Sequence, residues 1–596
     1  MNKKIIILSV LLQLPLIIFA NQADSLTRAI VNKYGCLEIQ VSDLVRVNNL
    51  DSVMPVDKVG LSKKCGFLYP YVLDEWESRL AIHPLDPNIQ AVMWHDGSYV
   101  ENPISITFDG GKSWKETVVP FNKCLIPSGL AVSLATDPSI QITNDGKIFA
   151  SSTLFNNNCD VPVGCNYIVV VRGIIDKTVG IKWEKTIVLQ KATLTGVMTD
   201  RDNVTVDINN NNFVYVIWTF FDKNSDGLSF FSRTTNGGNT WEKSRNIYNP
   251  INDKPGRINK LNIVNAECDP NKIAVLPSKF GGTLINLMNR LFFTNSGKLS
   301  NDLAVIKSND KGLTWDNKAT IFSTIRDNGI DILDPIDPDL NHMNPNETFI
   351  FPKNPNGSSN LTAQGFRYVW ATWLPQITIN KNNGTIYVAH INGVYTEVSG
   401  VKNVPLPRIY LNISRDGGKT WSSDMQVSRT GVDIPVLTPG ANQSFNTAVS
   451  ILPNNLIGIT YYDFRFYTGP TPANQPISPL LTDYWLAIYE DTGKELVFKT
   501  EVRLTNNSFD IRWTRPTFTY YRMGDYVDLV GSQDTFYAAF CLGNNIKPHG
   551  INIQTKECLP YPYTNTGHYP PYGPCLTFPQ NHQDIYYRSV KILNSK

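Results

Sequence analysis

The chain has 596 residues, with 54 Lys and Arg against 52 Asp and Glu, so its formal net charge is only +2. This balance excludes a polybasic protein that binds nucleic acid or an anionic membrane surface, because such binding requires a concentrated excess of positive charge. Charged residues make up 18% and aromatic residues 11% of the chain. Such a chain can bury a large core, which excludes wholesale disorder.

The first twenty residues have the features of a cleaved signal peptide. Lys3 and Lys4 precede an apolar run over 5–19, and Ala20 is a small residue at a plausible cleavage position. The run is shorter than the ~20 residues that span a bilayer, and an uncleaved N-terminal anchor is the alternative. We expect no membrane span after cleavage. The sequence therefore predicts a secreted or periplasmic protein with a signal peptide over 1–20, an N-terminal segment over 21–70 and one domain over 71–596.

The nine cysteines are compatible with an oxidising compartment. Because nine is an odd number, at least one cysteine is free or pairs with another molecule. Cys159 and Cys165 flank a short loop and form one candidate disulfide, and Cys558 and Cys575 form another. The sequence contains no C-x-x-C, so it gives no support to a zinc ribbon or a thioredoxin-like site.

One short pattern, Ser/Thr-x-Asp-x-Gly-x-Ser/Thr-Trp, occurs four times, once with Asn in place of Asp. The copies span 107–114, 234–241, 308–315 and 414–421. Such a pattern predicts a turn between two strands: the Asp accepts backbone N–H groups, the Gly supplies a positive φ, and the hydroxyls tie the ends. We expect the Trp to begin the next strand and to carry its ring into the core.

The spacing of the copies predicts a ring of strand units. Their first positions are 127, 74 and 106 residues apart, and 74 residues suit one four-stranded unit with its loops. Strand periodicity is found in segments between and around the copies. These segments are 77–84, 89–94, 104–108, 167–172, 200–207, 213–218, 228–232, 374–379, 385–389, 445–450, 456–463, 484–489, 524–529, 536–540 and 584–588.

The four copies resemble the Asp-box (BNR) repeat of sialidase-type β-propellers. Phrases over most of 74–590, such as Asp200-Arg201 and Tyr461 to Arg465, are similar to a secreted bacterial family labelled exo-alpha-sialidase-like. The resemblance implies an all-β propeller of six to seven four-stranded blades. It places the boxes on outer hairpins, away from the central site, so their aspartates are assigned a structural role. Six units are complete in the sequence and a seventh is partial. This last unit is expected either to be a blade completed by an N-terminal strand or only to close the ring.

The ligand site of a propeller is expected at one mouth of the central channel, where the first strands of the blades begin. Polar residues at those strand starts are therefore the candidates. They are Glu77, Arg79, Asp137, Asp200, Arg201, Arg367, Asp463, Arg465 and Asp525, with the aromatic residues Trp76, Tyr461, Tyr462 and Tyr526 close in sequence.

The resemblance to sialidases implies a defined set of parts. Three arginines hold the sugar carboxylate through paired hydrogen bonds, a Tyr activated by a Glu is the nucleophile, and an Asp is the acid/base. By residue type and position these roles fall to Arg201, Arg367 and Arg465, to Tyr462 with Glu77, and to Asp137, with Asp463 and Asp525 as further substrate-binding residues. The sequence departs from the family in having no Arg-Ile-Pro tripeptide, and its nearest first-blade arginine is Arg79.

Each candidate also has a structural interpretation. Asp463 and Arg465 can form an internal ion pair that ties a loop, and Asp525 after Gly524 can cap a turn. Because Tyr461 and Tyr462 alternate across a strand, one of them is expected to pack between blades. The charges over 200–202 can belong to a solvated loop.

The sequence predicts a secreted propeller that acts on or binds glycans. Its enzyme version is an exo-glycosidase that releases sialic acid or a related acidic sugar, and the alternative is a non-catalytic propeller that binds a glycan or a protein surface. There is no H-E-x-x-H, no G-x-S-x-G and no phosphate-binding glycine loop, so we expect neither a metal nor a cofactor. Fold alone does not decide between these functions.

Overall fold

A computed structural model shows that the regular secondary structure of the described residues is β-strand. In the described part of the chain the only helices are two short 3-10 turns, η1 (Pro250–Asn252) and η3 (Ser278–Phe280). The predicted all-β class is therefore confirmed. The described residues are 37–48, 75–96, 102–121, 132, 134–156, 165–224, 226–256, 262–294, 297–325, 332–333, 368–370, 374–398, 401–432, 441–467, 481–511, 514–516, 520–545 and 581–594.

The first half of the chain forms four antiparallel units in chain order, each of four strands except the second, which has a fifth. The third and fourth units are joined by one parallel bridge between Gly227 and Glu267. The strands are β3 (Glu75–Ile82), β4 (Gln90–Asp96), β5 (Pro103–Thr107) and β6 (Lys115–Val118); β7 (Leu134–Ile142), β8 (Lys147–Asn156), β9 (Cys165–Asp176) and β10 (Gly180–Trp183), with β11 (Ile187–Ala192) also on β9; β12 (Met198–Val206), β13 (Val214–Phe221), β14 (Gly227–Thr234) and β15 (Arg245–Tyr248); and β16 (Asn265–Val275), β17 (Leu284–Thr294), β18 (Gly297–Ser308) and β19 (Thr320–Thr324).

The second half continues with two more such units and ends in a sheet that also includes the N-terminal strands. The strands are β22 (Gln376–Ile379), β23 (Ile386–Val398), β24 (Val401–Ser414) and β25 (Met425–Gln426); β26 (Ser444–Ile451), β27 (Leu456–Asp463), β28 (Leu481–Asp491) and β29 (Leu496–Arg503), with β30 (Phe509–Asp510) on β28; β33 (Asp528–Ser532), β34 (Thr535–Asn545) and β35 (Asn581–Asn594) with β1 (Glu38–Val41) and β2 (Val45–Arg46); and a small sheet of β20 (Ile332–Leu333), β21 (Tyr368–Trp370), β31 (Arg515–Pro516) and β32 (Tyr520–Arg522).

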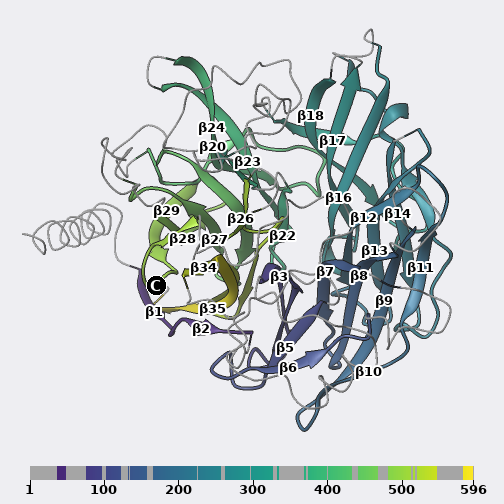
Figure 1. Ribbon diagram of the computed structural model, residues 1–596, viewed down its shortest axis with the longest axis horizontal. Coiled ribbons are helices and arrows are strands. Elements are labelled where there is room, and N and C mark those ends of the chain that lie inside the picture. Colours follow the sequence, from purple (N-terminus) through teal and green to yellow (C-terminus); the bar gives the residue numbers. More distant parts are fainter. Residues whose placement is uncertain are drawn as a thin grey trace, which may run out of the picture.

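The first strands of successive units lie next to one another in chain order. Contacts run from β3 to β7, β12, β16, β22, β26 and β33, and β33 in turn contacts β3. In Figure 1 the colours accordingly run round the molecule, from purple and blue strands through teal to green and yellow. This radial order of small antiparallel sheets is the arrangement of a β-propeller, as the sequence predicted.

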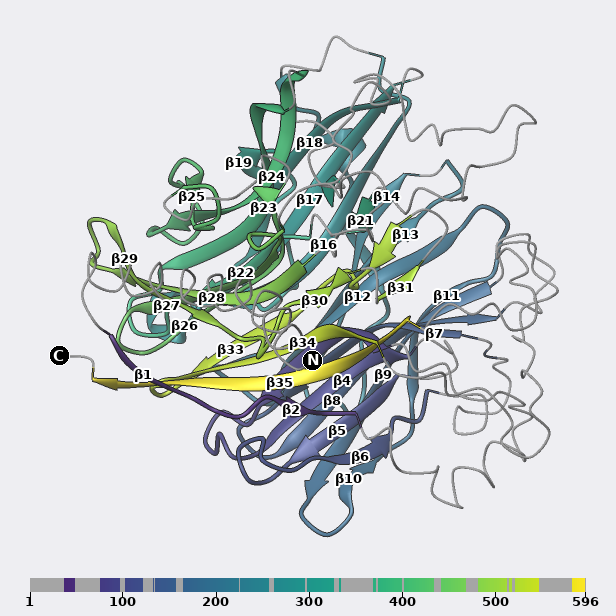
Figure 2. The same ribbon diagram turned by 60° about the vertical axis from the view of Figure 1, so that its left-hand side comes forward.

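The two ends of the described chain meet in one sheet. β1 pairs with β35 in antiparallel fashion, with Val41 opposite Val590, and Figure 2 shows the purple β1 alongside the long yellow β35. The buried Asp584 accepts hydrogen bonds from Arg46 (2.9 Å) and Asn48 (2.8 Å). The predicted completion of the last unit by an N-terminal strand is therefore seen in this pairing.

Inner strands of the units are buried on both faces because each sheet is covered by its neighbours. In β27 all eight residues from Leu456 to Asp463 are buried, and the run Val214–Trp218 of β13 is buried throughout. Such segments read as continuous rather than alternating apolar runs. The high aromatic content of the chain follows from this construction, because rings fill the space between twisted sheets.

The repeated turns have the hydrogen bonds that their sequence predicted. In the fourth copy, Asp416 accepts the N–H groups of Lys419 (3.0 Å) and Thr420 (2.9 Å), and the Ser414 hydroxyl accepts the N–H of Gly418 (2.9 Å). Burial alone would raise the pKa of Asp416, but its bonds with Thr420 outweigh burial and lower the pKa to about 2. The aspartate is thus held ionised by the turn, which is a structural role.

The tryptophans of these turns differ from expectation. Trp421 precedes the fourth strand of its unit, β25, rather than beginning it. Its ring is only partly buried and stacks on Phe322 of the preceding unit, with ring centroids 4.3 Å apart. Trp315 instead meets Phe231 edge to face, with ring centroids 5.4 Å apart. The tryptophans therefore join neighbouring sheets near their outer edges instead of entering the centre of the core.

Within the described residues, no helix is long and apolar enough to cross a membrane.

Cys165 is disulfide-bonded, while Cys268 and Cys541 are free and buried. The other cysteines of the two predicted pairs lie outside the described residues, as does the predicted signal peptide.

Candidate functional site

Three predicted site residues occupy the same unusual backbone position on consecutive first strands. Glu77 in β3, Asp137 in β7 and Arg201 in β12 have left-handed φ angles of 58°, 51° and 55°. Each lies where the pairing with the next strand shifts register. A left-handed bulge costs conformational energy and turns a side chain out of the regular alternation, and such bulges are common beside functional sites. Asn446 in β26 repeats the geometry, with φ 47°.

Glu77 links the first unit to the chain segment that precedes β33. Its Oε2 lies 3.0 Å from His95 Nδ1, and its Oε1 accepts the backbone N–H of Asp525 at 3.1 Å. The side chain is 1% exposed. These two contacts hold the carboxylate in one orientation.

Asp137 lies among other carboxylates. Burial, followed by the charges of Asp200 and Glu77, raises the pKa of Asp137 well above its usual range. The Thr136 hydroxyl donates to its Oδ2 at 2.9 Å. A carboxyl group in this environment holds a proton at a pH where an ordinary aspartate is ionised, so Asp137 is suited to donate one.

Arg201 is neutralised by carboxylates from its own strand and from β16. Its Nη1 bonds to the buried Asp269 and lies 3.9 Å from Glu267, while its Nε lies 3.8 Å from Asp200. Burial opposes its charge, but Asp269 and Asp200 more than compensate and raise the pKa of Arg201. The guanidinium therefore serves first as the counter-charge of this acidic region.

Asp202 faces away from Arg201 toward the second unit, where the hydroxyls of Ser151 and Thr153 bond to it. Burial raises its pKa to about 7, even though both hydroxyls lower it. Asp202 is buried, while Asp200 and Arg201 are partly exposed and bonded within β12. Their interpretation as solvated loop charge is therefore wrong.

Tyr526 covers one side of this region. The guanidinium of Arg79 stacks on its ring at 3.6 Å from the centroid, and its hydroxyl donates to the carbonyl of Pro138 at 3.4 Å. Burial is the main cause that raises the pKa of Tyr526, and the charges of Glu77 and Asp137 raise it further.

We use the name first-strand cluster for Glu77, Asp137, Asp200, Arg201 and Asp525, which carry four carboxylates and one guanidinium.

Tyr462 does not meet Glu77 as predicted. It is fully buried in β27, where its hydroxyl donates to the carbonyl of Cys541 (2.8 Å) and accepts the N–H of the same residue (3.1 Å). Its ring lies 4.3 Å from that of Tyr484, and burial raises its pKa well above the usual range. The assignment of Tyr462 as an activated nucleophile is therefore wrong, because the residue is a packing element between sheets.

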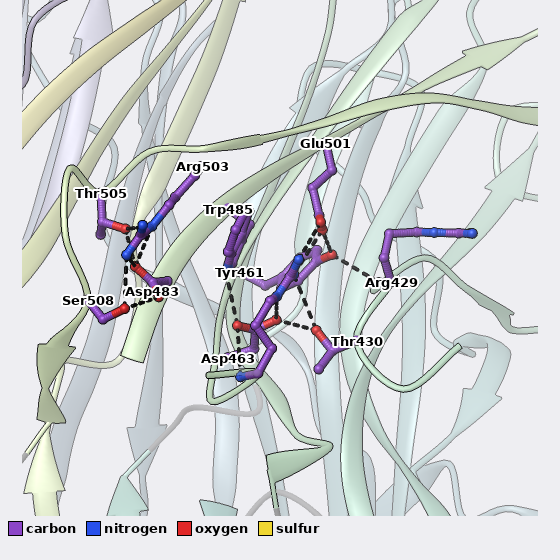
Figure 3. Close-up of polar contacts among 11 residues, drawn as sticks. Arg429, Thr430, Tyr461, Asp463, Asp483, Trp485, Glu501, Arg503, Thr505 and Ser508 are labelled. Carbon is purple, nitrogen blue, oxygen red and sulfur yellow. Dashed lines mark hydrogen bonds and ion pairs between the residues drawn. The ribbon is translucent and has the colours of Figure 1, made fainter. Parts of the chain in front are cut away.

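Arg465 and Asp463 form an internal ion pair rather than part of the first-strand cluster (Figure 3). Arg465 Nε bonds to Asp463 Oδ2 (2.7 Å) and its Nη1 to Glu501 Oε2 (2.6 Å). Thr430 bonds to Asp463 from the loop after β25. The structural interpretation is thus correct here: the pair ties a loop to the sheet, and Arg465 is not available to hold a sugar carboxylate.

Figure 3 also shows a second buried carboxylate in the same unit, Asp483, which accepts bonds from Arg503 (2.8 Å) and Ser508 (2.7 Å). Tyr461 bonds to Glu501 and accepts the N–H of Arg429 at 2.9 Å. Tyr461 and Tyr462 are therefore both buried, whereas the sequence predicted that only one of them would pack between blades. Arg367, the third predicted arginine, lies outside the described residues.

The structure thus brings together Glu77, Asp137, Arg201 and Asp525, and places Tyr462, Asp463 and Arg465 elsewhere. Sequence reasoning missed Asp269, Glu267 and His95. The sequence did contain one signal for the bulges that carry these residues: a proline interrupts a strand at 138 and again at 270, and proline inside a strand marks an edge or a bulge.

Within the described residues no group of three or more His, Cys, Asp or Glu side chains is arranged to hold a metal ion.

Comparisons with known proteins give no family for the chain. No family model and no curated protein matches it. Among solved structures, it resembles one described as Hadza microbial sialidase Hz136, with 12% identity, a TM-score of 0.38 and coverage of 76% of this chain and 72% of that one. A Penicillium chrysogenum alpha-L-arabinanase has 11% identity, a TM-score of 0.39 and coverage of 77% and 99%. An ulvan lyase of polysaccharide lyase family PL25 has 13% identity, a TM-score of 0.39 and coverage of 79% and 92%.

Proposed function

We propose that the chain is a glycan-acting enzyme that cleaves glycosidic bonds with carboxylates of the first-strand cluster. One observation supports this most directly: Glu77 and Asp137 occupy equivalent left-handed bulges on adjacent first strands, and their environments differ. Glycosidases of the common type combine a protonated carboxyl group with an ionised one. The proposal gives the protonated role to Asp137, whose pKa is raised, and the ionised role to Glu77.

In this proposal Asp137 is the proton donor to the leaving oxygen, because burial and its acidic neighbours raise its pKa. Glu77 is the ionised partner, acting as nucleophile or as base toward water. Its bonds with His95 and the Asp525 backbone fix its carboxylate before substrate binds. Arg201 positions Asp200 through its charge rather than holding the sugar directly.

The geometry supports a neutral glycan better than release of sialic acid. Arg201 is bonded to Asp269 and Arg465 to Asp463 and Glu501. Neither is free to form a clamp for a sugar carboxylate, and the cluster carries more negative than positive charge. An acidic sugar would meet this excess of carboxylates, whereas a neutral sugar would form hydrogen bonds with them.

The proposal includes a more specific fold and location. The six complete units and the sheet of β33, β34, β35 and β1 would form seven blades, whose first strands line a central channel within one domain over 71–596. The segment over 1–20 would direct export, so the protein would act outside the cytoplasm.

A non-catalytic glycan-binding propeller is the second candidate. It is favoured by the low exposure of Glu77 and Asp137, 1% and 8%, because reacting carboxyl groups must reach the substrate. The two candidates differ in a simple way: only the enzyme requires Asp137 to exchange a proton.

The test is hydrolysis of a panel of neutral and acidic chromogenic glycosides and of native polysaccharides by the purified protein. The Asp137→Asn and Glu77→Gln variants should each lower kcat by about a hundredfold or more. Asp483→Asn, which changes a buried carboxylate of the sixth unit, should lose little activity if it remains folded. Unchanged turnover in Asp137→Asn would exclude the enzyme proposal. Glycan binding without turnover in the unaltered protein would favour the second candidate.

A further inference from the structure

The fourth and fifth units pack face to face, and the character of this contact changes along the strands. One part is apolar: Ile285 and Leu287 of β17 pack in one cluster with Ile386 and Val388 of β23. Alternate residues of a strand lie on one face. The same faces therefore continue with Asn289 of β17 and with His390 and Asn392 of β23, which are polar.

Cross-strand pairing extends both polar faces. Asn301 of β18 lies opposite Leu291 and Asn289 opposite Leu303, so the two asparagines share a face of the fourth unit. On the fifth unit, Arg408 of β24 lies opposite Asn392. Two asparagines on one sheet thus face the side of the next sheet that carries Arg408.

Backbone bonds bring the two faces together at this level. Asn392 Nδ2 donates to the carbonyl of Thr324 at 3.2 Å, which joins the fifth unit to β19. The neighbouring Ile325 N–H donates to the carbonyl of Asn301 at 2.9 Å. The strand pair that carries Arg408 is therefore tied through Thr324 and Ile325 to the strand that carries Asn301.

The amides of Asn289 and Asn301 are buried and have no hydrogen-bond partner within the described part of the chain. Their side chains are 0% and 2% exposed, and neither Nδ2 nor Oδ1 of either residue has a partner. A buried amide that bonds to nothing loses its hydration without compensation. Two such amides on one face, with donors and acceptors both open, indicate a position where a polar group is held.

Arg408 adds a buried charge that has no ion-pair partner among the described residues, although the charge of Asp463 favours its protonated form. It is 4% exposed, and the hydrogen bond of its guanidinium goes to the carbonyl of the adjacent Pro407 at 3.2 Å. No carboxylate of the described residues lies within ion-pair distance of it, and burial lowers its pKa to about 10. The nearby Asp424 is already bonded by Asn392, Asn412 and Ser323.

We propose that the fourth and fifth units hold a small hydroxylated carboxylate, of the uronic acid kind, between Arg408, Asn289 and Asn301. The guanidinium and the asparagine Nδ2 groups donate to the oxyanion, which matches their lack of acceptors. The asparagine Oδ1 atoms accept from sugar hydroxyl groups, which a simple inorganic anion lacks. This site is separate from the first-strand cluster, so it does not depend on the proposed glycosidase activity.

The test is calorimetric titration of the full-length protein with sodium glucuronate, with glucose and with sodium sulfate, at one ionic strength. Glucuronate should bind at one saturable site, and glucose much more weakly. Arg408→Gln should weaken glucuronate binding by about tenfold to a hundredfold, as expected for the loss of a charge-assisted pair of bonds. Arg172→Gln, which removes a guanidinium paired with Glu184 on β9, should leave binding unchanged.

Two further outcomes decide the chemistry. Sulfate should bind more weakly than glucuronate, because it offers the asparagine Oδ1 atoms no hydroxyl group; sulfate binding as tight as that of glucuronate would overturn the proposed hydroxylated ligand. Asn301→Leu should also weaken glucuronate binding without lowering the thermal stability of the unliganded protein, because it replaces an unsatisfied amide by an apolar group of similar size. Absence of binding of both anions to the unaltered protein, or unchanged binding in Arg408→Gln, would overturn the proposal.

Discussion

Glu77 and Asp525 are separated by 448 positions in the chain and joined by a hydrogen bond of 3.1 Å from the Asp525 backbone N–H to Glu77 Oε1. The bond connects the first unit to the segment that leads into the last one. It also fixes the carboxylate that we propose as a reacting group. The same contact therefore serves the closure of the fold and the geometry of the site.

Gly524 makes this contact possible, and its replacement should break it. A Cβ at this position would lie 2.6 Å from the Glu77 backbone nitrogen, at a φ of +91°. We expect Gly524→Ala to lower the free energy of unfolding by about 2–4 kcal/mol, through backbone strain and steric overlap, and to lower activity. Denaturant titration measures the first effect.

Gly493 provides a matched control. Its φ is +83°, and a Cβ there would meet nothing within 4 Å. Gly493→Ala should therefore cost only the strain of the left-handed backbone, about 1 kcal/mol. Equal losses in the two variants would contradict the importance of the Glu77 contact.

Tyr462→Phe separates packing from catalysis. The hydroxyl bonds to the backbone of Cys541, so its removal should lower the free energy of unfolding by about 1 kcal/mol. It should leave kcat on any substrate of the protein nearly unchanged, while Glu77→Gln should not. A kcat loss in Tyr462→Phe as large as in Glu77→Gln, with the fold intact, would restore the tyrosine as a reacting group.

Much of the fold could be predicted from the sequence because its determinants are local. The turn of 414–421 specifies its own hydrogen bonds through Ser414, Asp416 and Thr420, and apolar runs such as 456–463 predict their strands. The tryptophan of the turn was misplaced because its position depends on Phe322 of another unit. A contact between units cannot be read from either segment alone.

The candidate site was predicted only in part, for a related reason. Strand starts carry polar side chains both at the first-strand cluster and at internal ion pairs. Asp463 and Arg465 gave the same signal as Asp200 and Arg201, and the difference lies in partners that are distant in sequence. Glu501 completes the first pair, and Asp269 completes the second.

Asp202 should make stability depend on pH. Burial raises its folded pKa to about 7, above the unfolded value, so the folded state binds the proton more tightly. Its contribution to stability is present below about pH 4 and is lost as the pH rises toward about 7. The loss is on the order of 4 kcal/mol, because one pKa unit corresponds to about 1.4 kcal/mol.

Unfolding by denaturant at about pH 4.5 and about pH 8, in the unaltered protein and in Asp202→Asn, measures this contribution. The unaltered protein should lose more stability between the two conditions than the variant, since the amide that replaces the carboxyl group cannot titrate. A pH dependence that is the same in both proteins would show that Asp202 is ionised throughout or is not buried as described.

The pairing of Arg46 and Asn48 with Asp584 should be the most sensitive link between the two ends of the chain. The Asp584 side chain is fully buried, and it accepts a bond from each of the two N-terminal residues. Removing both partners in Arg46→Ala with Asn48→Ala leaves a buried carboxylate without them, which costs about 3–5 kcal/mol. The Lys499–Glu490 pair is a control, because both side chains are partly exposed and its removal by Lys499→Ala should cost about 1 kcal/mol or less. Adding Asp584→Asn to the double variant should recover part of the lost stability, since the buried charge that lost two hydrogen-bond donors is then gone. If the double variant unfolds at the same denaturant concentration as the unaltered protein, the N-terminal strands contribute little to closing the last sheet.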